Sequence, residues 1–270
     1  MKKIFITGAS SGIGLELAKA YLSQGNIVGV CSRNLSHLST AWIKIYQILP
    51  NNLFLYEADV TDRERIVSVI TQFATENGGL DILVANAGTM ITDKKRIPDF
   101  TNVREVLNTN IMGTINTFEA GLKIMLADLA NKDDGNHGHC DRNGRSSHSG
   151  NLVAIASVAG MVGLPHTAAY SASKAAVLKW CESFAIDLRP LGIVVTAIAP
   201  GFVDTPFIRF NRHYMPFIMS PEKAARLIIK AVEKNKELYI FPLRMNIVMT
   251  LLYHLPRFLY RWLMRLVRFY

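Results

Sequence analysis

The stretch KKIFITGASSGIGLELAKA, residues 2–20, joins an apolar run to a helical pattern through a loop of glycine and serine. Residues 2–7 predict a buried strand, because they are short, apolar and rich in β-formers. Residues 12–24 carry apolar side chains at helical spacing and predict an amphipathic helix. This order of strand, glycine-rich loop and helix predicts an α/β fold that opens with a ligand-binding turn.

The glycines of this loop each have a physical reason to stand where they do. Gly8 permits a tight turn, Gly12 lets the backbone approach a pyrophosphate, and Gly14 lets the helix pack closely on the strand. The helix then offers free N–H groups and a positive dipole to phosphate. The spacing is GxxxGxG and not the commoner GxGxxG, so a glycine-rich turn without a ligand is the alternative. The expected contacts with a dinucleotide here are Gly8, Ser10, Ser11, Gly12, Ile13 and Gly14.

Strand-like and helix-like segments alternate along the rest of the chain. The expected strands are residues 2–7, 26–31, 52–58, 80–86, 151–157, 192–199 and 237–241. The expected helices are residues 12–24, 35–48, 61–77, 102–130, 168–189 and 220–235. This alternation predicts a Rossmann-type, doubly wound, seven-stranded parallel sheet with helices on both faces. We expect one catalytic domain over residues 1–242 and a basic tail over residues 243–270.

Composition limits the class of protein. The chain has 270 residues, of which 50% are hydrophobic and 19% charged, which excludes a disordered chain. Cys31, Cys140 and Cys181 are too few for a disulfide framework and favour a reducing compartment. The first six residues imitate a signal peptide before glycines interrupt them, and no uncharged apolar run is long enough to span a bilayer. We therefore expect a cytoplasmic protein.

Residues 131–150, NKDDGNHGHCDRNGRSSHSG, interrupt the alternation with a polar insertion. We expect a surface loop that is dispensable for chemistry. It holds three histidines and a cysteine, namely His137, His139, Cys140 and His148. Their spacing matches no standard zinc pattern, so we expect no metal site.

The end of the second strand bears on cofactor choice. NAD-selective folds place an acid here to bind the ribose 2′-hydroxyl, but this chain has no Asp or Glu between Glu16 and Glu57. It offers Ser32 and Arg33, and a guanidinium suits the 2′-phosphate of NADP. A solvated surface arginine is the alternative.

Further segments complete a recognisable set. They are TGASSGIG at 7–14, Asp59-Val60, Asn86-Ala87-Gly88, Asn110, Ser157, YSASK at 170–174 and PGFVDT at 200–205. In this order they resemble the short-chain dehydrogenase/reductase family over residues 2–241. The family often has NNAG where this chain has Ala85 before Asn86.

The resemblance implies an oxidoreductase with a catalytic set of Asn110, Ser157, Tyr170 and Lys174, and Arg33 makes NADP(H) the expected cofactor. It also implies cofactor contacts beyond the glycine loop, from Asp59, Val60, Asn86, Ala87, Gly88, Tyr170, Lys174, Pro200, Gly201, Val203 and Thr205. In the family, the asparagine interrupts a long helix and carries a water that connects the lysine to solvent. The resemblance further implies a homodimer or homotetramer built on the two long helices.

The residues make chemical sense on their own. Tyr170 and Lys174 are four apart and share one helix face. A nearby ammonium and an oxidised nicotinamide favour tyrosinate, so we expect them to lower the pKa of Tyr170 from its usual value of about 10. Ser157 ends the expected strand 151–157 and is placed to hydrogen-bond the oxygen of a carbonyl or alcohol substrate. Segment 202–219 is rich in Met and Phe and indicates an apolar or lipid-like substrate. A dinucleotide-sensing protein without turnover and a membrane-attached scaffold are the alternatives, and the full catalytic set argues against both.

The tail carries most of the basic character. Residues 238–270 hold five arginines and no acid, so about +4 of the +9 net charge remains on the other 237 residues. Residues 245–256 are apolar and end at a proline, while 257–270 show a helical pattern. On a helical wheel the four arginines of 257–270 span about 80°, opposite Phe258, Trp262, Leu263, Leu266 and Phe269. This predicts peripheral contact with an anionic membrane. Packing on the domain or on a partner subunit is the alternative, and we expect no nucleic acid, because the aromatics form one stripe.

Overall fold

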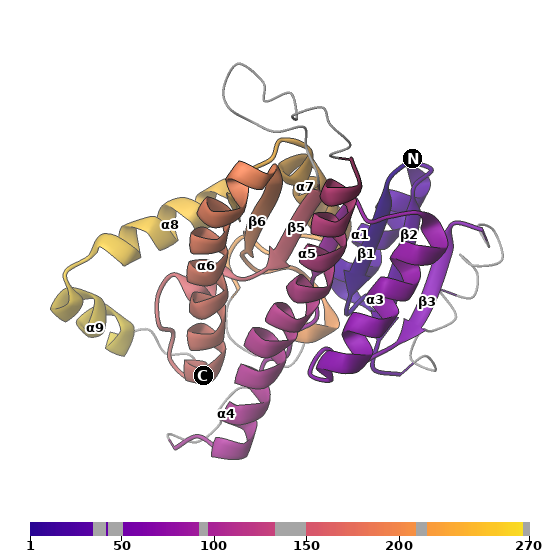
Figure 1. Ribbon diagram of the computed structural model, residues 1–270. Helices are drawn as coiled ribbons and strands as arrows, with labels where there is room; N and C mark the ends of the chain where they lie inside the picture. Colours follow the sequence, from indigo (N-terminus) through magenta and orange to yellow (C-terminus); the bar gives the residue numbers. More distant parts are fainter. Residues whose placement is uncertain (35–41, 43–50, 92–96, 133–149, 209–214, 267–270) are drawn as a thin grey trace.

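A computed structural model describes residues 1–34, 42, 51–91, 97–132, 150–208 and 215–266 of the chain (Figure 1). Its centre is a parallel sheet of seven strands in the order β3-β2-β1-β4-β5-β6-β7, which confirms the predicted Rossmann-type fold. The strands are β1 (Lys3–Thr7), β2 (Ile27–Ser32), β3 (Leu53–Glu57), β4 (Ile82–Ala85), β5 (Gly150–Ile155), β6 (Ile193–Pro200) and β7 (Leu238–Phe241). The order reverses between β1 and β4, and such a switch point opens a crevice at the carboxyl ends of the strands.

Helices cover both faces of the sheet because neighbouring strand residues point to opposite sides. In β1, Ile4 and Ile6 pack into the layer beneath α1 (Gly12–Ser23) and α7 (Pro221–Glu233). Phe5 packs into the other layer, beneath α3 (Arg63–Asn77), α5 (Gly113–Lys132) and α6 (Ala168–Leu188). All three of these strand side chains are fully buried. The continuous apolar strands in the sequence therefore reflect burial on two faces.

The long helix expected over residues 102–130 is three elements in the structure. A π-helical turn, Asn108–Met112, separates α4 (Phe100–Leu107) from α5. Gly113 follows this turn, where a Cβ atom would come within 2.5 Å of Val60 Cγ2. The turn therefore brings the helix backbone close to the segment after β3, and it places Asn110 at full burial.

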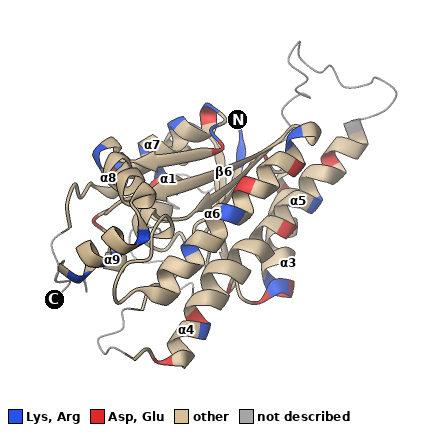
Figure 2. Ribbon diagram, turned by 90° about the vertical axis from the view of Figure 1, so that its left-hand side faces the viewer, with Lys and Arg blue, Asp and Glu red and all other residues tan. Residues whose placement is uncertain are grey.

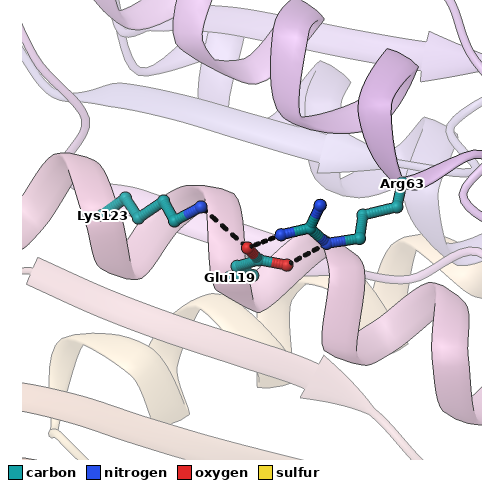
Figure 3. A network of polar contacts seen from close by, with 3 residues as sticks. All are labelled: Arg63, Glu119 and Lys123. Atoms are coloured by element: carbon teal, nitrogen blue, oxygen red, sulfur yellow. Dashed lines mark hydrogen bonds and ion pairs between the residues drawn. The ribbon is translucent and has the colours of Figure 1, made fainter.

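An exposed ionic network fastens α3 to α5 (Figure 3). Arg63 holds both carboxylate oxygens of Glu119, with Nε 2.8 Å from Oε2, and Lys123 Nζ lies 2.8 Å from Oε1. The hydrogen bonds from Arg63 and then Lys123 lower the pKa of Glu119 to about 2. Exposed pairs of this kind add little stability, so the buried layer carries most of the α3–α5 packing.

After β7 the chain forms α8 (Leu243–His254) and α9 (Arg257–Leu266), with the predicted break before Pro256. Both lie at one side of the molecule, beyond α6 (Figure 1). α8 contacts β7 and the turn Val158–Gly160 that follows β5, and Tyr260 of α9 packs in one apolar cluster with Val158. Within the described residues, no helix combines the length and the apolar character needed to cross a membrane. The expected helix 35–48, apart from Trp42, and residues 133–149 of the polar insertion lie outside the described residues, as do Arg268 and Phe269.

Candidate active site

A cavity of about 420 Å³ opens where the carboxyl ends of β1, β4, β5 and β6 meet. Its lining includes these predicted residues: Gly8, Ser10, Ser11, Gly12, Ile13, Ser32, Arg33, Asp59, Val60, Asn86, Ala87, Gly88, Ser157, Tyr170, Lys174, Pro200, Gly201, Val203 and Thr205. Gly14 and Asn110 do not line it. The cavity lies at the topological switch point, where open α/β sheets bind their ligands.

The glycine loop after β1 forms one end of the cavity, and its first two glycines leave little room for a side chain. Gly8 has a φ of +66°, and a Cβ atom there would lie 2.6 Å from Ala87 Cα. Gly12 has a φ of +58° and faces Thr205, whose Cγ2 would lie 3.0 Å from an added Cβ. Both positions therefore require glycine for its backbone conformation, and Gly8 also for its lack of volume.

Thr7 and Asn86 tie this loop to the end of β4. Asn86 Nδ2 donates to Thr7 O at 3.0 Å and to Gly8 O at 2.9 Å. Thr7 Oγ1 accepts from the backbone N–H groups of Asn86 and Ala87 at 3.1 and 3.2 Å. Gly14 packs against the same amide, since a Cβ there would lie 2.5 Å from Asn86 Nδ2. Gly14 thus shapes the loop from behind the cavity.

The first turn of α1 faces the cavity and fits the phosphates of a dinucleotide. Ser11 occupies the N-cap position, and its side chain accepts no hydrogen bond from the helix. The N–H groups of the first turn lack intrahelical partners and point to where Ser10, Ser11, Gly12 and Ile13 line the cavity. An uncapped helix start beside a glycine loop suits a pyrophosphate.

We call the loop 7–14 together with residues 86–88 the cradle, and Arg33 and Asp59 lie at its far end. Asp59 Oδ1 accepts from both the backbone N–H and the hydroxyl of Thr61, each at 2.8 Å. These bonds hold the aspartate in a turn after β3. Arg33 is exposed and lines the rim of the cavity at the end of β2. The rim can therefore present a guanidinium to a group on the ribose.

Ser157 and Tyr170 meet at the opposite end. Ser157 lies two residues beyond the end of β5, not within the strand as expected, and its Oγ accepts from Ala159 N at 3.1 Å. It also hydrogen-bonds the Tyr170 hydroxyl. Burial raises the pKa of Tyr170 to about 12, and the bond from Ser157 only partly opposes this rise. The phenol therefore keeps its proton at neutral pH.

Lys174 lies one helical turn after Tyr170 and is buried. Its Nζ donates to Ile155 O at 2.8 Å and lies 5.9 Å from the centre of the Tyr170 ring. Burial lowers the pKa of Lys174 to about 8. An ammonium has three protons, so two remain for a ligand in the cavity.

Asn110 lies behind this pair and is fully engaged by the protein. Its Nδ2 donates to Thr89 O and to Ser173 Oγ, both at 2.9 Å, and its Oδ1 accepts from Thr89 N at 2.8 Å. The amide therefore clamps the segment after Gly88 against α6. Its predicted part in a water relay stays a prediction.

Residues 2–214 match the sequence profile of the short chain dehydrogenase family. The chain belongs to the short-chain dehydrogenase/reductase family. An uncharacterized oxidoreductase of Myxococcus xanthus is 34% identical over 238 residues, covering 88% of this chain and 86% of that protein. One of Mycobacterium tuberculosis is 28% identical, covering 87% and 85%.

Solved structures agree on the fold of this short-chain dehydrogenase/reductase. A short-chain dehydrogenase from Streptomyces avermitilis has a TM-score of 0.75 at 25% identity, covering 92% of this chain and 90% of that one. A short chain dehydrogenase from Burkholderia cenocepacia in complex with NADP has a TM-score of 0.72 at 24% identity, covering 88% and 94%. The protein is thus an oxidoreductase of this family.

Sequence reasoning missed two kinds of residue in this short-chain dehydrogenase/reductase. Trp42 is fully buried, and its Nε1 donates to Ala9 O at 3.0 Å, which braces the glycine loop from outside. The second kind comprises apolar side chains on the substrate side of the cavity, which no motif identifies individually. They are Met90, Val158, Leu164, Phe202, Phe207 and Ile208. The Met and Phe content of segment 202–219 signalled only the last three, while no motif marks Trp42.

Proposed function

We propose that the protein is an NADP(H)-dependent oxidoreductase that interconverts a carbonyl compound and a secondary alcohol. The pairing of Ser157 with a protonated Tyr170 at the end of the cavity opposite the glycine cradle carries this proposal. That arrangement supplies an acid and a hydrogen-bond donor to one substrate oxygen. A protein that only senses a dinucleotide has no use for either.

When bound, the dinucleotide supplies the hydride that reduces the carbonyl carbon. Tyr170 donates its proton to the substrate oxygen, and its pKa of about 12 ensures that this proton is present. Ser157 donates a hydrogen bond to the same oxygen and stabilises the charge that develops there. In the direction of oxidation, Tyr170 must instead lose its proton, which requires a positive charge nearby to lower its pKa.

Lys174 provides the nearest positive charge of the chain itself. Its ammonium is anchored on Ile155 O and keeps two protons for the ribose hydroxyls of the dinucleotide. At neutral pH it stays largely protonated, because its pKa is about 8. Lys174 therefore orients the cofactor and favours the tyrosinate form of Tyr170.

We propose NADP(H) over NAD(H) because of the charge at the cradle rim. Arg33 lines the cavity after β2, and no acid occurs between Glu16 and Glu57 to repel a 2′-phosphate. A guanidinium binds phosphate with paired hydrogen bonds. The Burkholderia protein holds NADP on the same fold, which agrees with this choice.

We propose an apolar substrate because the walls beyond Tyr170 are apolar. The ring of Phe207 lies 5.9 Å from that of Tyr170, and Leu164 and Phe202 line the same side. Such walls bind hydrocarbon by excluding water. NADPH oxidation across aldehydes and ketones graded by chain length tests this, and we expect the efficiency to rise with length.

The Tyr170→Phe variant tests the chemistry. It removes the proton but keeps the ring, so turnover should fall about a thousandfold while NADPH binding, measured by titration, stays nearly unchanged. Tyr253→Phe, at an exposed tyrosine of α8, is the matched control and should behave as the unmodified protein. Near-normal turnover by Tyr170→Phe would show that another group is the acid.

The Arg33→Ala variant tests the cofactor choice. We expect NADPH binding to weaken about tenfold to a hundredfold, since a hydrogen bond to a charged group is worth roughly 1.5–3 kcal/mol, and NADH binding to change little. Arg104→Ala, at an exposed arginine of α4 away from the cavity, is the control. Tighter binding of NADH than NADPH by the unmodified protein would overturn the assignment.

A further inference from the structure

The outward face of α8 and α9 is strongly apolar although both helices pack on the domain. Phe258 is 76% exposed, Leu243 71% and Leu251 65%. We call the outward side of these two helices the basic apolar face. Its apolar members are Leu243, Ile247, Leu251, Phe258, Trp262 and Leu266, and its basic members are Arg244, Arg257, Arg261 and Arg265. So many large apolar side chains gathered on two short helices mark an interaction surface.

Helix geometry separates this face from the face that packs on the domain. In α8, Leu243, Ile247 and Leu251 follow at intervals of four, on the side away from the buried pair Met245 and Met249. In α9, Phe258, Trp262 and Leu266 likewise form one exposed stripe, whereas Tyr260 is buried and hydrogen-bonds Gly163 O. The two sequence-based alternatives for the tail are therefore compatible, because they use different sides of the same helices.

Arginines border the apolar stripe, and the segment that carries both contains no acid. Arg244, Arg257, Arg261 and Arg265 are exposed, and residues 238–270 contain no Asp or Glu. None of the ion pairs among the described residues includes them. Figure 2 shows basic positions and no acidic one on α8 and α9 themselves, whereas both colours mix on α5 and α6. The face therefore combines apolar surface with uncompensated positive charge.

We propose that the basic apolar face docks on the surface of an anionic lipid bilayer. Apolar side chains at the headgroup boundary and arginines facing lipid phosphates are the combination that such a surface binds. Trp262 adds an indole, which favours the interface between water and lipid. A second copy of this chain fits less well, because two such faces would bring at least four arginines of each copy together.

The two helices that carry this face support the apolar residues on the substrate side of the cavity, which we call the substrate wall. Met245 packs so closely on the turn after β6 that a Cβ atom at Gly201 would lie 3.1 Å from its Cγ. The α8–α9 pair also packs on Val158, Leu164 and Phe202, which line the cavity. Docking would therefore bring the bilayer against the outer side of the two helices that support the substrate wall. The docking itself does not rest on the proposed redox chemistry.

Co-sedimentation of the full chain tests this with phosphatidylcholine vesicles that contain or lack phosphatidylglycerol. We expect the protein to sediment with the anionic vesicles at low salt, to be released at high salt, and to stay in the supernatant with neutral ones. Tryptophan fluorescence gives a second measurement of vesicle binding. The emission of the exposed Trp262 should shift to shorter wavelength when the protein binds, and the Trp262→Phe variant should not show that shift.

A triple variant separates this face from overall charge. Arg257→Gln/Arg261→Gln/Arg265→Gln should weaken partitioning about a hundredfold, at about 1 kcal/mol for each charge. Arg226→Gln/Lys230→Gln/Lys234→Gln removes the same charge from exposed positions of α7 and at its end, and should change partitioning far less. Thermal melts check that each variant is folded, and titration with NADPH measures the affinity of the cofactor site independently of vesicle binding.

Three outcomes would overturn the docking. One is an intact chain that stays in the supernatant with anionic vesicles at low salt. Another is an equal loss of binding in both triple variants, which would mean a response to net charge alone. The third is a concentration-dependent dimer, seen by sedimentation velocity, that Leu251→Ser and Phe258→Ser disrupt while vesicles do not bind, which would assign the face to a second copy.

Discussion

The cradle, residues 7–14 and 86–88, and the helix pair, residues 243–266, are held in place in different ways. The cradle is fixed by backbone, with Gly8 at positive φ and within contact of Ala87 Cα. The helix pair is fixed by flexible side chains, above all Met245 and Met249, against residues far away in the chain. A backbone-defined site tolerates almost no change, whereas a methionine contact can adjust its shape.

This difference suits what each region contacts. The cradle meets a ligand of fixed geometry, and phosphate oxygens need N–H groups in set directions. The helix pair lies behind the substrate wall, where Met245 contacts the turn at Gly201. An apolar substrate makes few directional demands, so an adaptable support is sufficient there. Substitutions in the two regions should therefore differ in size and in kind.

The largest effect should come from Gly8→Ala. The added Cβ meets Ala87 Cα at 2.6 Å at a φ of +66°, so strain and overpacking together cost about 3–4 kcal/mol of unfolding free energy. Dinucleotide binding should be lost as the loop moves. Gly25→Ala is the matched control, since Gly25 has a φ of +77° but nothing within 4 Å. It should cost only about 1–2 kcal/mol and leave binding intact in urea unfolding and titration experiments.

A smaller effect is expected from Met249→Ala in the helix pair. Removing this buried side chain should cost about 2–3 kcal/mol, at the lower end for core methionines because the neighbours can relax. NADPH affinity should stay unchanged, while the KM for an apolar carbonyl should rise. Leu251→Ala, on the exposed side of α8, should change stability by less than about 0.5 kcal/mol. A loss of NADPH binding in Met249→Ala would erase the distinction between the two regions.

The strands, the glycine loop and the break at Pro256 were predictable from the sequence, because each depends on the local requirements of the backbone. Continuous apolar runs between the helical segments predicted all seven strands to within two residues at every boundary, and the glycine spacing located the cradle. The break at Pro256 was equally visible, because proline cannot continue a helix. Residues close together in the sequence determine these features, so a single sequence is enough to predict them.

Contacts between distant side chains were not predictable in this way. The hydrogen bond from Tyr260 to Gly163 joins residues 97 apart, and Trp42 braces Ala9 from outside any motif. The family resemblance implied the interruption at Asn110, but the π-helical form of the turn and the close packing of Gly113 on Val60 have no signal in periodicity. The packing of the tail on its own domain likewise follows from the tertiary structure alone.

Burial also changes the acid–base picture. The sequence places Lys174 beside Tyr170 and predicts a lowered tyrosine pKa in the loaded site. In the structure, Lys174 is bonded to Ile155 O and burial raises the pKa of Tyr170 to about 12. The lowering therefore has to come from the complete site with its cofactor, because spacing along a helix cannot reveal desolvation.

Lys174 lies where the two regions meet, and its titration gives the smallest predicted effect. A Cβ at Gly88, in the cradle, would lie 3.5 Å from its Nζ, and one at Gly160, beside the helix pair, would lie 2.6 Å from its backbone. Burial lowers the Lys174 pKa from 10.5 to about 8. Above pH 8 the folded protein has released this proton while the unfolded chain still binds it, so stability rises with pH.

The window for this rise is narrow, because the buried thiols of Cys31 and Cys181 act in the opposite sense above pH 9. Their pKa is raised from 9.0 to about 12, so the unfolded chain releases protons that the folded protein keeps. Because both thiols already begin to titrate in the unfolded chain below pH 9, the Lys174 contribution is measured against Lys174→Met, which keeps both thiols. Between pH 8 and 9 the unmodified protein should gain about 1 kcal/mol, or about 2 °C in Tm, relative to that variant. Lys230→Met, at an exposed lysine of α7, should show the pH dependence of the unmodified protein. An equal rise in Lys174→Met would show that the ammonium is hydrated, which would mean that the junction between cradle and helix pair is open to water.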